Sequence, residues 1–186
     1  MKSALLLIDI QNDYFPGGAM ELVGMARAAA HAAEALAAFR QTGRPRFHGQ
    51  HIALGPGAPF FRPDTPGVEI HASVRPLAGE PIIRKHYPNA FRDTGLLEAL
   101  KNAGIEEVVI CGAMSHMCID ATTRAAFDYG FACTVIHDAF ASRDLAFAGL
   151  TIPAAQVHGA FMAALAPLYA RVWSLEEFLR TFKVIS

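Results

Sequence analysis

The chain has 186 residues, of which 53% are hydrophobic, so it can bury the core of one compact domain spanning residues 1–186. Lysine and arginine total 16 and aspartate and glutamate total 17, which gives a net charge of −1. This balance argues against a surface for nucleic acid or for anionic membranes and favours a small-molecule substrate.

The chain opens with a predicted strand, Ser3 to Ile10. Only five apolar residues, Ala4 to Ile8, come before Asp9, too few for a signal peptide or a membrane span. We therefore expect a soluble, cytoplasmic protein with no membrane partner. The cysteines form no Cys-x-x-Cys pair and are odd in number, so we expect three free thiols, Cys111, Cys118 and Cys133.

Apolar runs bounded by turn residues alternate with helical stretches along the chain, a pattern typical of β-α units around a parallel sheet. The predicted strands are Ser3–Ile10, Arg44–Gln50, Pro81–Lys85, Glu107–Gly112, Ala132–His137 and Ala170–Trp173. The predicted helices are Glu21–Thr42, Thr94–Ala103, His116–Tyr129, Pro153–Leu165 and Leu175–Phe182. We predict an α/β fold: a three-layer α-β-α sandwich around a six-stranded, mainly parallel open sheet of the Rossmann-like kind.

A proline- and glycine-rich segment between Gly55 and Gly67 carries two aromatic residues, Phe60 and Phe61. It is long for a plain connection. Two interpretations stand side by side: an active-site flap, or a surface loop held by two buried phenylalanines.

Three predicted strands deliver reactive side chains to the carboxyl edge of the sheet, where ligands bind in open parallel sheets. Asp9 follows the first strand, Lys85 ends the third, and the fourth leads through Gly112 to Cys118. A carboxylate at the end of a buried strand is costly unless it is paired, and Lys85 supplies the pair. The pair is either purely structural or, with a thiol at the same edge, part of a catalytic site; the convergence favours catalysis.

Cys118 lies three residues after Ser115, which we expect to cap the following helix. The first turn of a helix stabilises an anion, so we expect the pKa of the Cys118 thiol to be lowered, and further so by a nearby lysine. Cys111 and Cys133 lie inside apolar strands, where buried structural cysteines are common. Cys118 is therefore the predicted nucleophile.

Three motifs occur in an order that is similar to the isochorismatase-like cysteine hydrolases, a superfamily that includes the nicotinamidases. They are Leu6-Leu-Ile-Asp-Ile-Gln-Asn-Asp13, the segment from Lys85 to Phe91, and Cys118-Ile-Asp-Ala-Thr-Thr-Arg-Ala-Ala-Phe-Asp-Tyr-Gly130. The resemblance runs from about Ala4 to the C-terminus and includes Thr65–His71 and Asp138-Ala139. Three separate motifs in order are a specific signal.

The resemblance implies a catalytic triad of Asp9, Lys85 and Cys118, in which the aspartate takes the thiol proton and the thiolate attacks a carbonyl. It also implies a cis peptide bond between Ala113 and Met114. The backbone N–H groups of Met114 and Cys118 would then form an oxyanion hole. The implied fold is the isochorismatase-like hydrolase fold, and similar proteins usually form dimers or tetramers. The helices around Phe127 and Phe161 offer apolar surface for such a homo-oligomer.

The metal-binding motif of nicotinamidases is incomplete in this chain. In Phe47-His-Gly-Gln-His51, Gly49 stands where those enzymes have an aspartate, and Phe60 falls near the place of a further histidine ligand. A site built from His48, His51 and His71 stays an alternative. We expect no metal and no cofactor.

We therefore predict a metal-independent amidohydrolase that cleaves an amide or ureide C–N bond of a small molecule through an acyl-enzyme thioester. The alternatives are a metal-dependent nicotinamidase and a catalytically inactive binding or assembly module. The residues expected to line the substrate pocket are Phe15, Phe60, Tyr87, Phe91, His116 and Met117.

Overall fold

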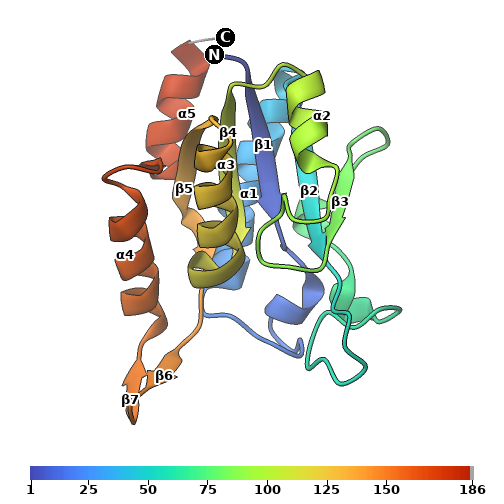
Figure 1. Ribbon diagram of the computed structural model, residues 1–186, viewed down its shortest axis with the longest axis vertical. Helices are drawn as coiled ribbons and strands as arrows, with labels where there is room; N and C mark the ends of the chain where they lie inside the picture. Colours follow the sequence, from blue (N-terminus) through green and yellow to red (C-terminus); the bar gives the residue numbers. More distant parts are fainter. Residues whose placement is uncertain (185–186) are drawn as a thin grey trace.

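A six-stranded parallel sheet forms the centre of the computed structural model, which describes residues 1–184 (Figure 1). Its strand order is β3-β2-β1-β4-β5-β8. The strands are β1 (Ser3–Ile8), β2 (Arg46–His51), β3 (Ile82–Lys85), β4 (Glu107–Ala113), β5 (Ala132–Ala141) and β8 (Arg171–Trp173). The predicted α/β fold and parallel sheet are confirmed.

Helices cover both faces of the sheet and complete the predicted three layers. The helices α1 (Met25–Gln41) and α5 (Leu175–Val184) contact each other and the strands of one face. The opposite face carries α2 (Leu96–Asn102), α3 (Asp120–Asp128) and α4 (Ala154–Leu165) (Figure 1). Short 3₁₀ turns occur at Asn12–Tyr14, Pro66–Val68 and Ala72–Val74. Within residues 1–184, no helix combines the length and apolar character that crossing a membrane requires.

The core is built around β1, whose residues Ser3–Ile8 are all buried. This strand lies between β2 and β4 with helices above and below, so both of its faces need apolar side chains. The continuous run Ala4–Ile8 meets that need. The strand stops before Asp9, whose positive φ of 55° turns the chain out of the sheet.

Gly112 lets β4 pass close to β1 just before the chain turns towards Cys118. Its φ is +134°, and a Cβ atom there would collide with the backbone carbonyl of Ile8. Glycine is therefore required at this position, and it brings the ends of β1 and β4 together at the carboxyl edge.

The structure adds a hairpin that the sequence pattern does not predict. Its strands, β6 (Leu145–Phe147) and β7 (Leu150–Ile152), have only three residues each and project beyond the carboxyl edge of the sheet (Figure 1). The two connecting residues, Ala148 and Gly149, both have positive φ, as in a type I′ hairpin turn. Such turns are usually predicted from an Asn-Gly pair, and Ala-Gly is a much weaker sequence signal.

Three predicted boundaries were wrong by more than two residues. α3 begins at Asp120 instead of His116, because a π-helical turn, Ser115–Ile119, precedes it. β5 continues to Ala141 instead of ending at His137, after a register shift against β4 between Ile110 and Gly112. α1 begins at Met25 instead of Glu21, because Gly24 takes a left-handed conformation with φ of 75° and the helix starts after it.

Candidate active site

Asp9, Lys85 and Cys118 meet at the carboxyl edge of the sheet, as their motifs predict. The Nζ atom of Lys85 lies 2.7 Å from Asp9 Oδ2 and 3.3 Å from Cys118 Sγ. Asp9 and Lys85 are completely buried and Cys118 is 4% exposed. A carboxylate, an ammonium group and a thiol thus share one enclosed volume and can act on one reacting atom.

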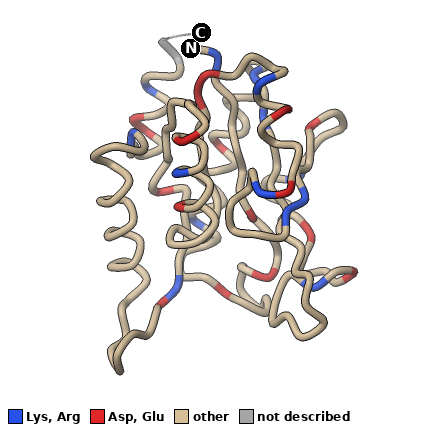
Figure 2. Tube along the Cα trace, viewed as in Figure 1, with Lys and Arg blue, Asp and Glu red and all other residues tan. Residues whose placement is uncertain are grey.

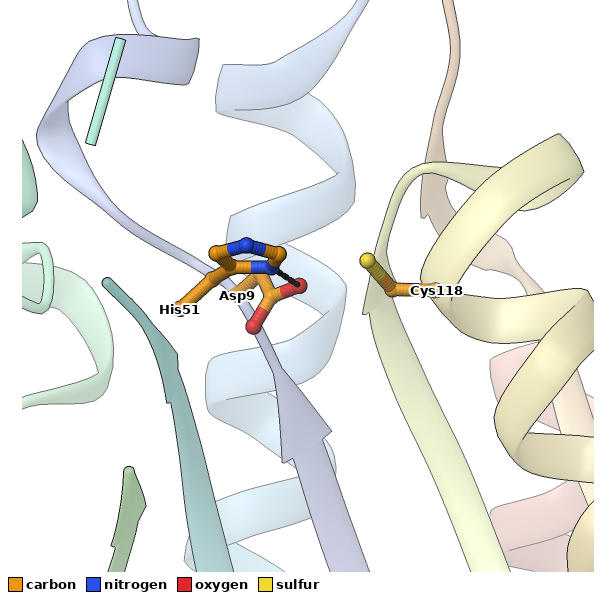
Figure 3. A group of neighbouring side chains, drawn as sticks. All are labelled: Asp9, His51 and Cys118. Carbon is orange, nitrogen blue, oxygen red and sulfur yellow. Dashed lines mark ion pairs between the residues drawn. The ribbon is translucent and has the colours of Figure 1, made fainter. Parts of the chain in front are cut away.

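His51 lies between Lys85 and Asp9 because its strand, β2, separates β3 from β1. It pairs in register with Lys85, and its Nδ1 atom lies 3.0 Å from Lys85 Nζ. Nδ1 also lies 4.0 Å from Asp9 Oδ2, and Figure 3 shows the imidazole, the carboxylate and the Cys118 sulfur grouped together. Burial and the Lys85 charge lower the pKa of His51 to about 4, so the ring is neutral near pH 7 and its Nδ1 accepts a hydrogen bond from the ammonium group.

Lys85 carries the positive charge of the site. Burial opposes that charge, but Asp9 and Cys118 outweigh it and raise the lysine pKa. The backbone carbonyl of Tyr87, 3.1 Å from Nζ, accepts a further hydrogen bond. The ammonium group is therefore held in place from several sides.

The pKa of the Cys118 thiol is raised, and the expectation of a lowered pKa was wrong. Burial raises the pKa of Cys118, the negative charge of Asp9 raises it further, and Lys85 opposes both only in part. Asp9 Oδ2 contacts the Lys85 ammonium group at 2.7 Å, and Asp9 Oδ1 has no hydrogen-bond partner among residues 1–184. A carboxylate with free acceptor capacity beside a protonated thiol is suited to take the thiol proton.

Ser115 does not cap the helix, contrary to the prediction. The chain enters a π-helical turn, Ser115–Ile119, directly after Met114, and α3 follows at Asp120. The Ser115 hydroxyl lies 2.8 Å from His158 Nδ1 and donates to the Ala141 carbonyl, so it ties the turn to α4 and β5. The peptide bond between Ala113 and Met114 is cis, as predicted.

The three histidines considered as metal ligands do not converge. His48 is buried inside the sheet with Nε2 2.9 Å from Glu80 Oε2. His71 accepts a hydrogen bond from Ser73 N and stacks on Phe15, with ring centroids 3.6 Å apart. Only His51 reaches the carboxyl-edge site.

A second set of possible metal ligands lies at the catalytic edge itself. Within the described chain, the group whose ligand atoms lie within 4.8 Å of one another consists of Asp9, His51 and Cys118. The Lys85 ammonium group contacts all three and already supplies the positive charge there. These residues do not fit a metal ion.

The predicted pocket residues lie at different places around the site. The carbonyl of Tyr87 contacts Lys85, while its ring lies 3.6 Å from the Arg92 guanidinium carbon. His116 Nδ1 lies 2.9 Å from Ser142 Oγ, and Met117 is 41% exposed. These two precede the nucleophile on the π-helical turn and stay candidates for substrate contact.

Phe91 is a core residue, and the structure gives no support to a pocket role. Its ring packs on Tyr129 and Phe131, which follow the carboxyl end of α3, away from the catalytic edge. Phe15 is 8% exposed and stacks on His71. Phe60 is half-buried, with its ring 5.8 Å from that of Tyr14.

The segment 55–67 lies over the catalytic edge and is held there by Phe61. The Phe61 side chain is fully buried, with its ring 4.6 Å from Tyr14 and 5.7 Å from His51. Its backbone N–H donates to Asp13 Oδ2 at 2.6 Å. The two sequence interpretations therefore combine: the segment is fastened by a buried phenylalanine, and that phenylalanine packs against the site.

Asp13 and Tyr14 are two residues near the site that the sequence prediction did not assign. Burial and the charge of Asp9 raise the pKa of Tyr14, so its phenol is neutral. Asp13 ends the first family-like motif and Tyr14 follows it. This position was the one sequence feature that could have indicated that either residue lies near the site.

Comparisons with known proteins agree with this geometry. The family model described as "Isochorismatase domain" matches residues 3–177. An isochorismatase family protein of Bacillus subtilis, YddQ, is 53% identical over 180 residues, which cover 97% of this chain and all of that protein. Maleamate amidohydrolase of Pseudomonas putida is 31% identical over 156 residues, covering 76% and 73% of the two chains.

A solved structure supports the same assignment. The crystal structure of an isochorismatase from Pseudomonas putida KT2440 has 41% sequence identity and a TM-score of 0.89, with 95% of this chain and 89% of that chain covered. With a family model over most of its length and a relative 53% identical over nearly all of it, this chain belongs to the isochorismatase family of hydrolases.

Proposed function

We propose that this protein is a metal-independent cysteine amidohydrolase that cleaves the C–N bond of a small amide or ureide. The single observation that carries the proposal is the enclosed contact of Lys85 Nζ with Asp9 Oδ2 and with Cys118 Sγ. A base, a cation and a nucleophile at one point form the arrangement that acyl transfer needs.

The first step forms a thioester. Asp9 accepts the Cys118 proton while the sulfur attacks the substrate carbonyl, so the thiolate exists only as the C–S bond forms. Lys85 stabilises the developing negative charge on sulfur, because its ammonium group is fixed 3.3 Å away. The backbone N–H groups of Met114 and Cys118 are the proposed donors to the carbonyl oxygen as it becomes an oxyanion.

The C–N bond then breaks and the thioester is hydrolysed. Protonated Asp9 returns its proton to the departing nitrogen, which leaves as ammonia or an amine. Water attacks the thioester and gives up a proton to Asp9, which passes it to the Cys118 sulfur as the acid departs. The proton balance closes on Asp9 alone, in line with its free acceptor capacity.

The structure favours this mechanism over the metal-dependent alternative. His48 and His71 bond to Glu80 and to Ser73, and the one histidine at the site accepts a hydrogen bond from Lys85. The alternative of an inactive binding module leaves unexplained why Oδ1 of the buried Asp9 carboxylate has no hydrogen-bond partner among the described residues.

The proposal is tested by measuring ammonia release from a panel of small amides and ureides, including maleamate and nicotinamide, with and without hydroxylamine. We expect hydroxylamine to divert part of the product into a hydroxamate, because it competes with water for the thioester. Turnover without any hydroxamate would argue for direct attack of water and against the thioester.

Copies of this chain are also proposed to associate as a homodimer or homotetramer. No Lys, Arg, Asp or Glu occurs from Leu145 to Ala170, and Figure 2 shows the hairpin and α4 without charged residues. Phe147 and Leu150 are 75% and 70% exposed. Such uncharged apolar surface is typical of protein interfaces. Sedimentation analysis should give a multiple of 20.0 kDa, and Phe147→Ser with Leu150→Ser should lower the association state.

A further inference from the structure

The Thr122 hydroxyl joins the helix that follows the nucleophile turn to the segment that follows Lys85. Thr122 lies on α3, is completely buried, and accepts a hydrogen bond from the Ala90 N–H at 3.1 Å. Its hydroxyl also donates to the Pro88 carbonyl at 3.3 Å. The acceptor and the donor capacity of one hydroxyl are therefore both used on the backbone of a single neighbouring segment.

That segment carries a carbonyl that binds Lys85. β3 ends at Lys85, and the Tyr87 carbonyl accepts a hydrogen bond from Lys85 Nζ at 3.1 Å. Tyr87 directly precedes Pro88, so its carbonyl is one peptide unit from the carbonyl that Thr122 binds. A shift of the segment would therefore move the Tyr87 carbonyl, and the ammonium group with it.

The helix of Thr122 also begins at the turn that carries the thiol. Cys118 precedes Thr122 by four residues, about one helical turn, and its sulfur points towards the Asp9 carboxylate (Figure 3). Cys118 Sγ lies 3.3 Å from Lys85 Nζ. The contacts thus form a closed loop that runs from Cys118 to Lys85, on to the segment 87–90, and back through Thr122 to the nucleophile turn.

The neighbouring threonine shows how a purely structural hydroxyl is bonded in this helix. Thr123 is equally buried, and its hydroxyl donates at 2.7 Å to the Ile119 carbonyl, four residues earlier. A threonine inside a helix can satisfy its hydroxyl in this way without any other element. The Thr122 hydroxyl instead bonds outside its helix, and both of its partners belong to the segment after β3.

We propose that Thr122 is a positioning residue that holds the segment 87–90 against the nucleophile turn and so sets the contact between Lys85 Nζ and Cys118 Sγ. In the proposed mechanism Lys85 stabilises negative charge on the sulfur, and this stabilisation strengthens as the two groups approach. Thr122 acts through Lys85 and does not touch the substrate. The inference deepens the proposed amidohydrolase function and rests on it.

The first test separates the chemical step from substrate binding. Thr122→Val removes the hydroxyl, and Thr122→Ser keeps it. With an amide that wild type hydrolyses, we expect kcat per folded molecule to fall roughly 10- to 100-fold in Thr122→Val, the cost of displacing a reacting group by about 1 Å, with KM within about threefold of wild type. Thr122→Ser should keep kcat within about threefold of wild type. An unchanged kcat in Thr122→Val, or a rise in KM alone, would overturn the proposal.

The matched control is Thr123→Val, which also removes a completely buried hydroxyl from α3. It should lose a similar amount of stability in urea unfolding, yet keep kcat within about threefold of wild type. Equal falls of kcat in the two valine variants would overturn the positioning role. Should Thr122→Val not fold, the same comparison is made between Thr122→Ala and Thr123→Ala.

Alkylation of Cys118 by iodoacetamide tests the inference without any substrate. The Lys85 charge opposes the rise in the pKa of Cys118, so displacement of the lysine leaves less thiolate at a given pH. The alkylation rate near about pH 8, followed by mass spectrometry of the Cys118 peptide, should fall at least about threefold in Thr122→Val and stay unchanged in Thr123→Val. Equal alkylation rates in wild type and both variants would overturn the role of Thr122. Failure of wild type to hydrolyse any amide would instead count against the proposed function, and the alkylation rates would still decide the role of Thr122.

Discussion

Two buried carboxylates in this protein, Glu80 and Asp9, differ in how completely their oxygens are hydrogen-bonded. Glu80 is completely paired: Arg40, Arg46, His48 and the Leu77 N–H all donate to it or lie within hydrogen-bond distance. Asp9 is at least as deeply buried, yet its Oδ2 contacts Lys85 Nζ at 2.7 Å and its Oδ1 has no hydrogen-bond partner within residues 1–184.

The difference separates a structural charge from a reactive one. A carboxylate that accepts several hydrogen bonds is strongly stabilised as an anion, and the pKa of Glu80 is lowered well below its usual value, chiefly by Arg40. Such a group cannot take a proton at neutral pH. Asp9 keeps Oδ1 free of hydrogen bonds and adjoins the Cys118 thiol, so it can accept the thiol proton as the C–S bond forms.

Between the two carboxylates, the largest expected effect is the loss of turnover in Asp9→Asn. An amide cannot accept the proton of a thiol that is protonated at rest, so kcat should fall roughly 10²- to 10⁴-fold, the usual contribution of a general base. The measurement is steady-state turnover per folded molecule, with folding checked by circular dichroism. A kcat within tenfold of wild type would contradict the role of Asp9.

Glu80→Gln should instead lower the free energy of unfolding and leave turnover almost unchanged. Removing one charge of a buried cluster leaves its partners uncompensated, and the expected loss is about 3 kcal/mol of unfolding free energy, at the lower end because Arg40 and Arg46 are about a quarter exposed. Urea unfolding measures this loss. The kcat of the folded variant should stay within about threefold of wild type. A large fall would show that Glu80, like Asp9, is needed for turnover and would contradict the distinction.

Acid pH sharpens the same comparison. The hydrogen bond from Arg40 holds the folded-state pKa of Glu80 well below its ordinary value of 4.5, so the contribution of Glu80 to stability is present above about pH 4.5. It is lost as pH falls further, when the unfolded chain binds the proton first. Between pH 4.5 and pH 3, wild type should lose up to about 1.4 kcal/mol more per pH unit than Glu80→Gln. Equal slopes of unfolding free energy against pH in the two proteins would show that Glu80 does not contribute to the loss of stability in acid.

The smallest expected effect comes from His51. Its pKa of about 4 keeps it neutral near pH 7, so His51→Gln removes one hydrogen bond to Lys85 and no charge. We expect kcat/KM to fall roughly 2- to 10-fold, with an unchanged pH profile between pH 6 and 8. A metal chelator should leave wild-type activity unchanged; loss of activity that zinc restores would identify His51 as a metal ligand.

The convergence of Asp9, Lys85 and Cys118 was predictable because each lies at or shortly after the carboxyl end of a strand, within its own local motif. The family-like segments around Asp9, Lys85 and Cys118 carry that information in short runs of residues. The parallel sheet was predictable for the same reason, since its apolar runs alternate with helical stretches.

Features that depend on packing between distant segments were not predictable. The pKa of Cys118 depends on its burial and on Asp9, and local helix position alone indicated the wrong direction. His51 gains its place at the site from its register against Lys85, a pairing between two strands that are far apart in the sequence. Such contacts exist only once the strand order is known.

The central claim is that the Cys118 sulfur is the nucleophile, and one pair of variants tests it most directly. Turnover of an amide that wild type hydrolyses should fall by at least about 10⁴-fold in Cys118→Ala, the scale seen when a nucleophile is removed. The control is Cys133→Ala, which removes a different buried thiol, located on β5, and should keep wild-type turnover. Turnover retained in Cys118→Ala, or lost equally in both variants, would contradict the account.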